Sequence, residues 1–102
     1  MKVKITRSSG NVFEDLGFPP EEAEHLKLRS DLMIHLRKVI EAKKLKQAEA
    51  AKLFGVTQPR ISDLVQGKIH LFSIDTLVDM LAHAGVRVKF SLSTSKRKQA
   101  VA

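Results

Sequence analysis

The sequence predicts a small all-α domain that carries one β-strand near its C-terminus. Apolar residues recur at helical spacing over most of the chain, and glycines or prolines separate the helical segments. One short stretch after the last of these segments alternates apolar and polar residues instead. The length of 102 residues allows one domain with a modest core and is too short for two.

The first half of the chain predicts an arm followed by a long helix. Residues 1–10 are expected to form a flexible or strand-like arm, because Val3 and Ile5 alternate with polar residues before a Ser-Ser-Gly break. Asn11 is placed to cap a short helical turn. Pro20 then opens the long helix, since proline is tolerated in a first turn. The expected buried stripe of that helix consists of Leu26, Met33, Leu36 and Ile40.

Two short amphipathic segments in the middle of the chain flank a break at Gly55, Val56 and Thr57. Gly55 ends the first segment, because glycine reaches a positive φ without steric cost. Thr57 is placed to cap the second segment with its side chain. The residues expected to face inward are Ala50, Ala51 and Phe54 before the break and Ile61, Leu64 and Val65 after it. This is the layout of a DNA-binding helix-turn-helix, in which the second helix enters the major groove.

The last helix and the strand follow. Ser73 is a suitable cap for a helix that ends at Gly85, with Ile74, Leu77, Val78 and Leu81 towards the core. The alternation over 86–92 predicts a half-buried strand, and an unpaired apolar strand is an aggregation hazard. We expect it to pair with the same strand of a second copy, and a hairpin-like pairing with residues 2–7 of the same chain is the alternative. The expected dimerisation residues are Val86, Val88, Phe90 and Leu92.

The expected organisation is therefore an arm at 1–10, a helix-turn-helix domain at 11–85, a dimerisation strand at 86–92 and a disordered basic tail at 93–102. The start of the chain lacks the apolar region of a signal peptide, and no apolar run approaches the ~20 residues that span a membrane. Cysteine is absent, which excludes disulfides and thiolate metal sites. The simplest location is the cytoplasm, in association with the nucleoid.

Net charge favours a polyanionic partner. The formal charge is +7, and binding of basic proteins to nucleic acid is driven by counterion release. The four histidines have no metal-ligand spacing, so no metal or cofactor is expected. Neither a catalytic triad order nor a glycine-rich phosphate loop is present, and we do not expect an enzyme. Double-stranded DNA is therefore the expected partner.

Once the inward positions of the second helix are set, its outward residues are the candidate DNA contacts. Gln58 lies in the first turn, the end of the helix that approaches base edges, and glutamine bonds adenine bidentately. Three roles are possible for Arg60: a guanine contact, a phosphate contact or an ion pair with Asp63. Asp63 either accepts from a cytosine amino group or repels phosphate at wrong sites. The full set of expected DNA-binding residues is Gln47, Thr57, Gln58, Pro59, Arg60, Ser62, Asp63 and Lys68.

The stretch QAEAAKLFGVTQPRISDLVQGK, residues 47–68, resembles the DNA-binding domain of lambdoid phage repressors and the Xre family of bacterial regulators. Residues 11–45 resemble the front end of the HigA-like antitoxins, a branch of that family. The resemblance covers roughly residues 11–92. It departs at Ala50, where leucine is usual, at the large Phe54, and at Pro59, which replaces a residue that often reads a base.

This resemblance implies a lambda-repressor-like bundle in which Gln58 and Asp63 face the groove and Gln47 and Thr57 contact phosphates. It implies a repressor that binds a palindromic operator as a homodimer and regulates its own promoter. The HigA-like branch further implies an antitoxin that neutralises a RelE/HigB-like toxin. The alternative is a protein-interaction module whose helix-turn-helix no longer reads DNA.

Overall fold

The computed structural model describes residues 2–6 and 12–92, which are mostly helical. The elements in chain order are β1 (Lys2–Thr6), α1 (Val12–Asp15), α2 (Pro20–Lys43), α3 (Gln47–Phe54), α4 (Gln58–Val65), the 3-10 turn η1 (Ile69–Leu71), α5 (Ile74–His83) and β2 (Arg87–Ser91). The expected all-α class with a C-terminal strand is confirmed. The cap at Asn11 and the basic tail at 93–102 were also predicted, and both lie outside the described ranges.

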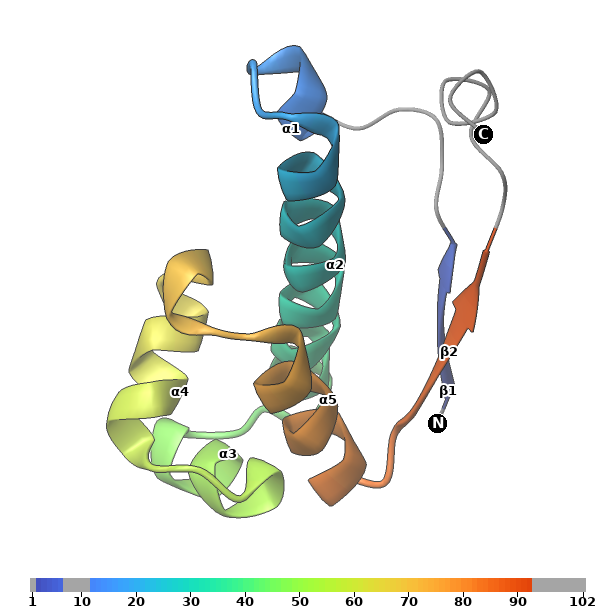
Figure 1. Cartoon of the computed structure of the whole chain (residues 1–102). Helices are drawn as coiled ribbons and strands as arrows, with labels where there is room; N and C mark the ends of the chain where they lie inside the picture. The colour runs from blue at the N-terminus through green and yellow to red at the C-terminus, as the bar shows by residue number, and fades with distance from the viewer. Residues whose placement is uncertain (1, 7–11, 93–102) are drawn as a thin grey trace.

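The long helix α2 runs the length of the molecule, and α3, α4 and α5 gather around its C-terminal half (Figure 1). It begins at Pro20, as the sequence predicts, with acidic residues Glu21 and Glu22 in the first turn. These carboxylates are favourable there because the helix dipole is positive at its N-terminus. The short helix α1 packs on this end of α2, and Phe13 and Phe18 meet edge to face with their ring centroids 6.2 Å apart.

One apolar cluster holds the helices together. Its largest fully buried members are Phe54, Phe72, Leu32, Leu36, Ile61, Leu64, Leu77, Met80 and Leu81. The stripe predicted for α2 is right at Met33 and Leu36 and wrong at its ends. Leu32 and Val39 are buried, whereas Leu26 and Ile40 are only half-buried. Leu26 is in the second turn of α2. That end of α2 extends beyond α3, α4 and α5 (Figure 1), so fewer elements pack on it.

The C-terminal strand finds its partner in its own chain. β1 and β2 pair in parallel, with Val3 opposite Val88 and Ile5 opposite Phe90. The premise that this strand has no partner within the chain is therefore wrong, because β1 occupies one of its edges. The alternative of pairing with residues 2–7 of the same chain is right in its partner, but the two strands run parallel and not as a hairpin. A parallel pair needs a long crossover, and the whole helical domain between the strands supplies it.

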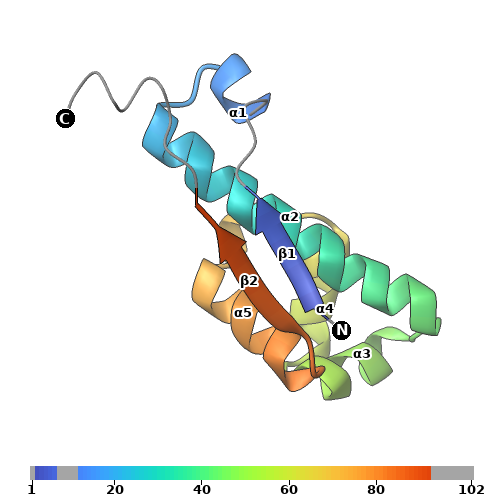
Figure 2. The same cartoon turned by 90° about the vertical axis from the view of Figure 1, so that its right-hand side faces the viewer.

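The two strands lie against α2 and α5, on the side of these helices away from α4 (Figures 1 and 2). The burial of β2 and its flanking residues falls along the chain. Val86 is buried and Val88 is half-buried against the helical core, while Phe90 and Leu92 are 50% and 80% exposed. The Val86 and Val88 side chains therefore pack on their own domain, and of the four expected dimerisation residues only Phe90 and Leu92 keep strongly exposed side chains.

Candidate nucleic-acid interface

The turn between α3 and α4 fixes the angle of the second helix. Gly55 has a φ of 68°, and the next N–H, of Val56, donates to the Ala51 carbonyl at 3.0 Å. This closes α3 with a left-handed residue, as the sequence predicts. Val56 then packs against the apolar cluster. The chain thus reverses within three residues and starts α4 at Gln58.

A second reason for glycine appears only in three dimensions. A Cβ built at Gly55 would lie 2.8–2.9 Å from ring atoms of His83, near the end of α5. Contacts that close do not occur between real side chains, so the imidazole covers the bare backbone of the turn. His83 lies at the surface, and its ring packs over Gly55.

Thr57 occupies the position before α4, but its side chain makes no capping hydrogen bond. The predicted cap is therefore wrong. Pro59 removes one first-turn N–H, and the N–H groups of Arg60 and Ile61 donate to the Thr57 carbonyl instead, at 3.1 and 3.3 Å. The Thr57 hydroxyl is thereby left on the exposed surface at the start of α4.

The outward face of α4 divides into two parts. Gln58 and Pro59 are exposed at its start, and the structure gives the Gln58 side chain no hydrogen bond to any part of the chain that it describes. Further along, Gln66 Nε2 donates to Ser62 Oγ at 3.0 Å, and Asp63 lies 3.6 Å from Lys68 Nζ. The start of the helix is therefore where side-chain donors and acceptors remain open to a ligand.

Two expectations for α4 need correction. Val65 was expected to face inward with Ile61 and Leu64, but it is 43% exposed while those two are fully buried. It follows Leu64 by one residue, which turns its side chain about 100° around the axis, away from the core. An ion pair with Asp63 was one of the three roles considered for Arg60, but the cationic neighbour of Asp63 is Lys68.

Arg60 instead ties α4 to the segment that follows it. Its Nη1 donates to the Leu71 carbonyl at 3.0 Å, and its guanidinium carbon lies 5.1 Å from the centre of the Phe72 ring. Because Phe72 is almost fully buried, the arginine anchors η1 to the recognition helix. A contact across eleven residues and a turn leaves no signal in sequence spacing. The Ser62–Gln66 bond, by contrast, has ordinary i,i+4 spacing.

Gln47 begins α3 and is exposed, as expected. Just before it, the Lys46 N–H donates to Glu49 Oε1 at 2.8 Å, which satisfies one of the N–H groups at this helix start. Gln47 and Thr57 thus mark the starts of the two helices of the motif. All eight predicted DNA-binding residues lie on these two helix starts, along α4 or in the turn after it.

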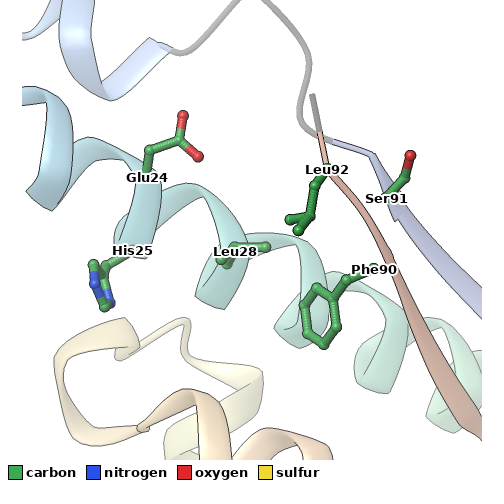
Figure 3. A pocket seen from close by; sticks show the side chains of 6 residues that line it. All are labelled: Glu24, His25, Leu28, Phe90, Ser91 and Leu92. Carbon is green, nitrogen blue, oxygen red and sulfur yellow. The ribbon is translucent and has the colours of Figure 1, made fainter. Parts of the chain in front are cut away.

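A shallow groove of about 170 Å³ lies away from this motif, between the first half of α2 and the end of β2 (Figure 3). Leu28 forms its floor beside Phe90 and Leu92, with Glu24 and His25 at the rim. In the ranges 2–6 and 12–92, no group of three or more His, Asp or Glu side chains is arranged to hold a metal ion. Nor does any helix in that part have the length and apolar character to cross a membrane.

Comparison with known proteins places this geometry in a class. Residues 12–93 match a family model described as a helix-turn-helix domain, so the chain belongs to that family. A solved structure described as a putative XRE family transcriptional regulator is 30% identical, with a TM-score of 0.67, over 74% of this chain and 85% of that one. Curated protein sequences gave no match. The protein is a DNA-binding transcription regulator of the XRE type.

Proposed function

We propose that the protein is a repressor that reads a specific operator through the start of α4. The observation that carries this proposal is the position of Gln58: it is the first residue of α4, exposed, and without a hydrogen bond within the described chain. A glutamine amide placed at this end of a recognition helix matches the N6 and N7 pattern of adenine in the major groove. Pro59 beside it offers only apolar contact.

The same proposal assigns phosphate contacts to residues around Gln58. Gln47 and the Thr57 hydroxyl lie exposed at two helix starts, and Lys68 follows α4 with its side chain 44% exposed. The Asp63 carboxylate, 3.6 Å from Lys68 Nζ, neutralises part of that charge in the unbound protein. Phosphate competes with Asp63 for this ammonium group, so the pair is a candidate for exchange on binding. The ion pair between Asp63 and Lys68 is weak, because its two groups are 3.6 Å apart and both side chains are partly exposed.

Operator recognition also motivates a homodimer. One helix reads only a few base pairs, and specific affinities of about 10⁻⁸–10⁻¹¹ M generally need two half-sites. Of the four residues first expected at a dimer contact, Phe90 and Leu92 remain exposed, beside the groove over Leu28. We therefore limit the proposed dimer contact to these two side chains and the groove that they line.

The antitoxin role is the most specific part of the proposal. Its support is the resemblance of residues 11–45 to the HigA-like branch, and it would make the protein the partner of a RelE/HigB-like toxin in the cytoplasm. Repression of the protein's own promoter belongs to the same role. The strands and the groove proposed for the dimer contact lie on the side of the molecule away from α4, so dimerisation there leaves the recognition helix accessible (Figure 1).

Binding to the DNA upstream of the protein's own gene tests the repressor function. Fluorescence anisotropy with that duplex and with a scrambled duplex of equal length should show tighter binding to the first. The affinity should also fall steeply with salt, with a log–log slope of about −0.9 for each phosphate neutralised. Equal, salt-independent and weak binding to both duplexes would favour the protein-interaction module instead.

Oligomeric state tests the dimer contact. The double variant Phe90→Ser with Leu92→Ser should be monomeric by light scattering and keep its helical circular dichroism, since both side chains are already exposed. Leu16→Ser, at a leucine that is 69% exposed in the turn after α1, is the matched control and should leave the mass unchanged. A double variant that stays dimeric would place the contact elsewhere.

A further inference from the structure

The helices α2, α3, α4 and α5 all end in the same type of backbone turn. After each helix a residue adopts a positive φ, and the N–H of the residue after it donates to a carbonyl five positions back. The residues with positive φ are Lys44 (52°), Gly55 (68°), Gly67 (75°) and Gly85 (78°), and the closing bonds, from Leu45, Val56, Lys68 and Val86, measure 2.9–3.1 Å. Three of the four turns therefore use glycine, and only the turn after α2 uses a lysine.

A lysine is an unfavourable residue for this turn. In the left-handed region its Cβ crowds the following carbonyl oxygen, which glycine avoids. Lys44 is the one residue other than glycine with a positive φ in the described chain. Glycine makes the same backbone turn at Gly55, Gly67 and Gly85, so the turn itself requires no side chain at this position. What lysine adds is its side chain.

The fold makes no visible use of that side chain. Lys44 is exposed, and the structure gives its ammonium group no hydrogen bond or ion pair with the residues it describes. A cation near the C-terminal end of a helix is favourable, but Lys43 already supplies one in the last turn of α2. The charge on Lys44 is thus open to a partner outside the chain.

Lys44 lies close to the proposed DNA interface. Lys43 ends α2, and Lys44 and Lys46 lie in the link that leads into α3; all three are exposed. Gln47, the first residue of α3, is a proposed phosphate contact. Of the nearby acids, Glu49 is occupied with the backbone N–H of Lys46, and Glu41 lies one turn back on α2. The link therefore presents positive charge at the edge of the helix-turn-helix.

We propose that Lys44 binds a phosphate of the DNA backbone, which extends the interface beyond the helix-turn-helix to the end of α2. The inference rests on DNA binding by the motif and adds a contact that the motif itself does not contain. The contact is electrostatic, so it contributes to operator and random duplexes alike. In this proposal, the lysine supplies a phosphate contact at the cost of a less favourable residue in the turn.

Salt-dependent binding to a random 20-base-pair duplex tests the proposal without knowledge of the operator. Lys44→Gln removes the charge and keeps the side-chain length, and its log–log slope should be about 0.9 shallower than that of the wild type. The loss in affinity should then be about 3.5-fold larger at 50 mM than at 200 mM salt. Lys44→Arg should restore the wild-type slope. Lys89→Gln, at an exposed lysine on β2 on the side away from α4, is the matched control (Figure 1).

Lys44→Gly separates the contact from the turn. It should lose the same slope as Lys44→Gln, while its melting temperature stays at or above that of the wild type because the turn gains its usual residue. Unchanged slopes in both variants, with wild-type protein that binds DNA, would overturn the inference alone. Wild-type protein that binds no duplex would overturn the proposed function together with it.

Discussion

Gln58 carries the specificity of the proposed interface at the scale of a single residue. Gln58→Ala should weaken operator binding by about 1–3 kcal/mol, because it removes a bidentate base contact. Binding to a random duplex should barely change, since no phosphate contact is lost. Anisotropy titrations on both duplexes check this, with melting temperature as the control for folding. Equal losses on the two duplexes would show that Gln58 contacts the backbone only.

Two features favour glycine at position 55: its positive φ and the His83 ring packed over it. A matched pair of variants separates the two contributions. Gly67→Ala meets only the positive φ of 75°, with no atom within 4 Å of the new Cβ. It should cost about 1 kcal/mol, or about 4–8 °C in melting temperature. Gly55→Ala meets a similar φ and also the His83 ring at 2.8 Å, so its cost exceeds that of Gly67→Ala by the free energy needed to move the exposed imidazole aside.

The contribution of the imidazole can then be measured directly. In a His83→Ala background, the extra cost of Gly55→Ala over Gly67→Ala should disappear, because the crowded ring is gone. Thermal unfolding followed by circular dichroism gives both differences. If the extra cost persists without the imidazole, it comes from the backbone of the turn.

At the scale of elements, Arg60 decides how firmly η1 is held against α4. Arg60→Ala removes a hydrogen bond to the Leu71 carbonyl and the contact with the Phe72 ring. Together these should be worth roughly 1–2 kcal/mol of unfolding free energy, given that the arginine is partly exposed. Urea unfolding measures the loss, and hydrogen exchange should show faster opening at the N–H groups of Leu71 and Phe72.

Arg60 was also expected to contact DNA, and the same variant tests that expectation. If its role is only to anchor η1, the salt slope of Arg60→Ala on random duplex should match that of the wild type. A slope shallower by about 0.9, with unchanged stability, would assign Arg60 to a phosphate and make the contact with Phe72 secondary. Arg60→Lys keeps the charge but cannot reproduce the planar stacking, so it should retain the slope and lose stability.

At the scale of the whole molecule, the pairing of β1 with β2 changes what truncation should do. Removal of everything after Gly85 deletes Val86, which is 5% exposed, and takes away the partner of β1. We expect this chain to lose about 2–4 kcal/mol or more of stability, from one buried valine and half-buried Val88 at about 1.5–3 kcal/mol each when fully buried. Chemical unfolding of the truncated chain measures it.

Truncation after Leu92 is the matched control. It keeps both strands and removes only residues 93–102, so the free energy of unfolding should stay within about 0.5 kcal/mol of the wild type. If truncation after Gly85 proves equally harmless, the strands add nothing to the stability of the helical domain, and their purpose would lie in contacts with another protein.

The sequence by itself determined the local features of this protein. Glycine at position 55 predicted a turn, and the structure shows left-handed backbone there. Serine at position 73 predicted a helix start, and its hydroxyl accepts a hydrogen bond from the Thr76 N–H. Helical periodicity found every long helix, because a pattern that repeats within one element needs no knowledge of the rest of the chain. The likeness of residues 47–68 to the Xre family predicted the class for the same reason: the motif is contiguous.

Only the tertiary structure decided which distant groups meet. β1 and β2 are separated by the whole helical domain, Arg60 reaches Leu71 and Phe72 across a turn, and His83 covers Gly55 from another helix. The register of a parallel pair and the neighbours of a side chain depend on how the helices cross, which no local pattern encodes. The alternation of residues 86–92 predicted that β2 needs a partner. That the partner is β1 follows from the packing of α5 against α2, because β2 lies on α5 and β1 lies on α2.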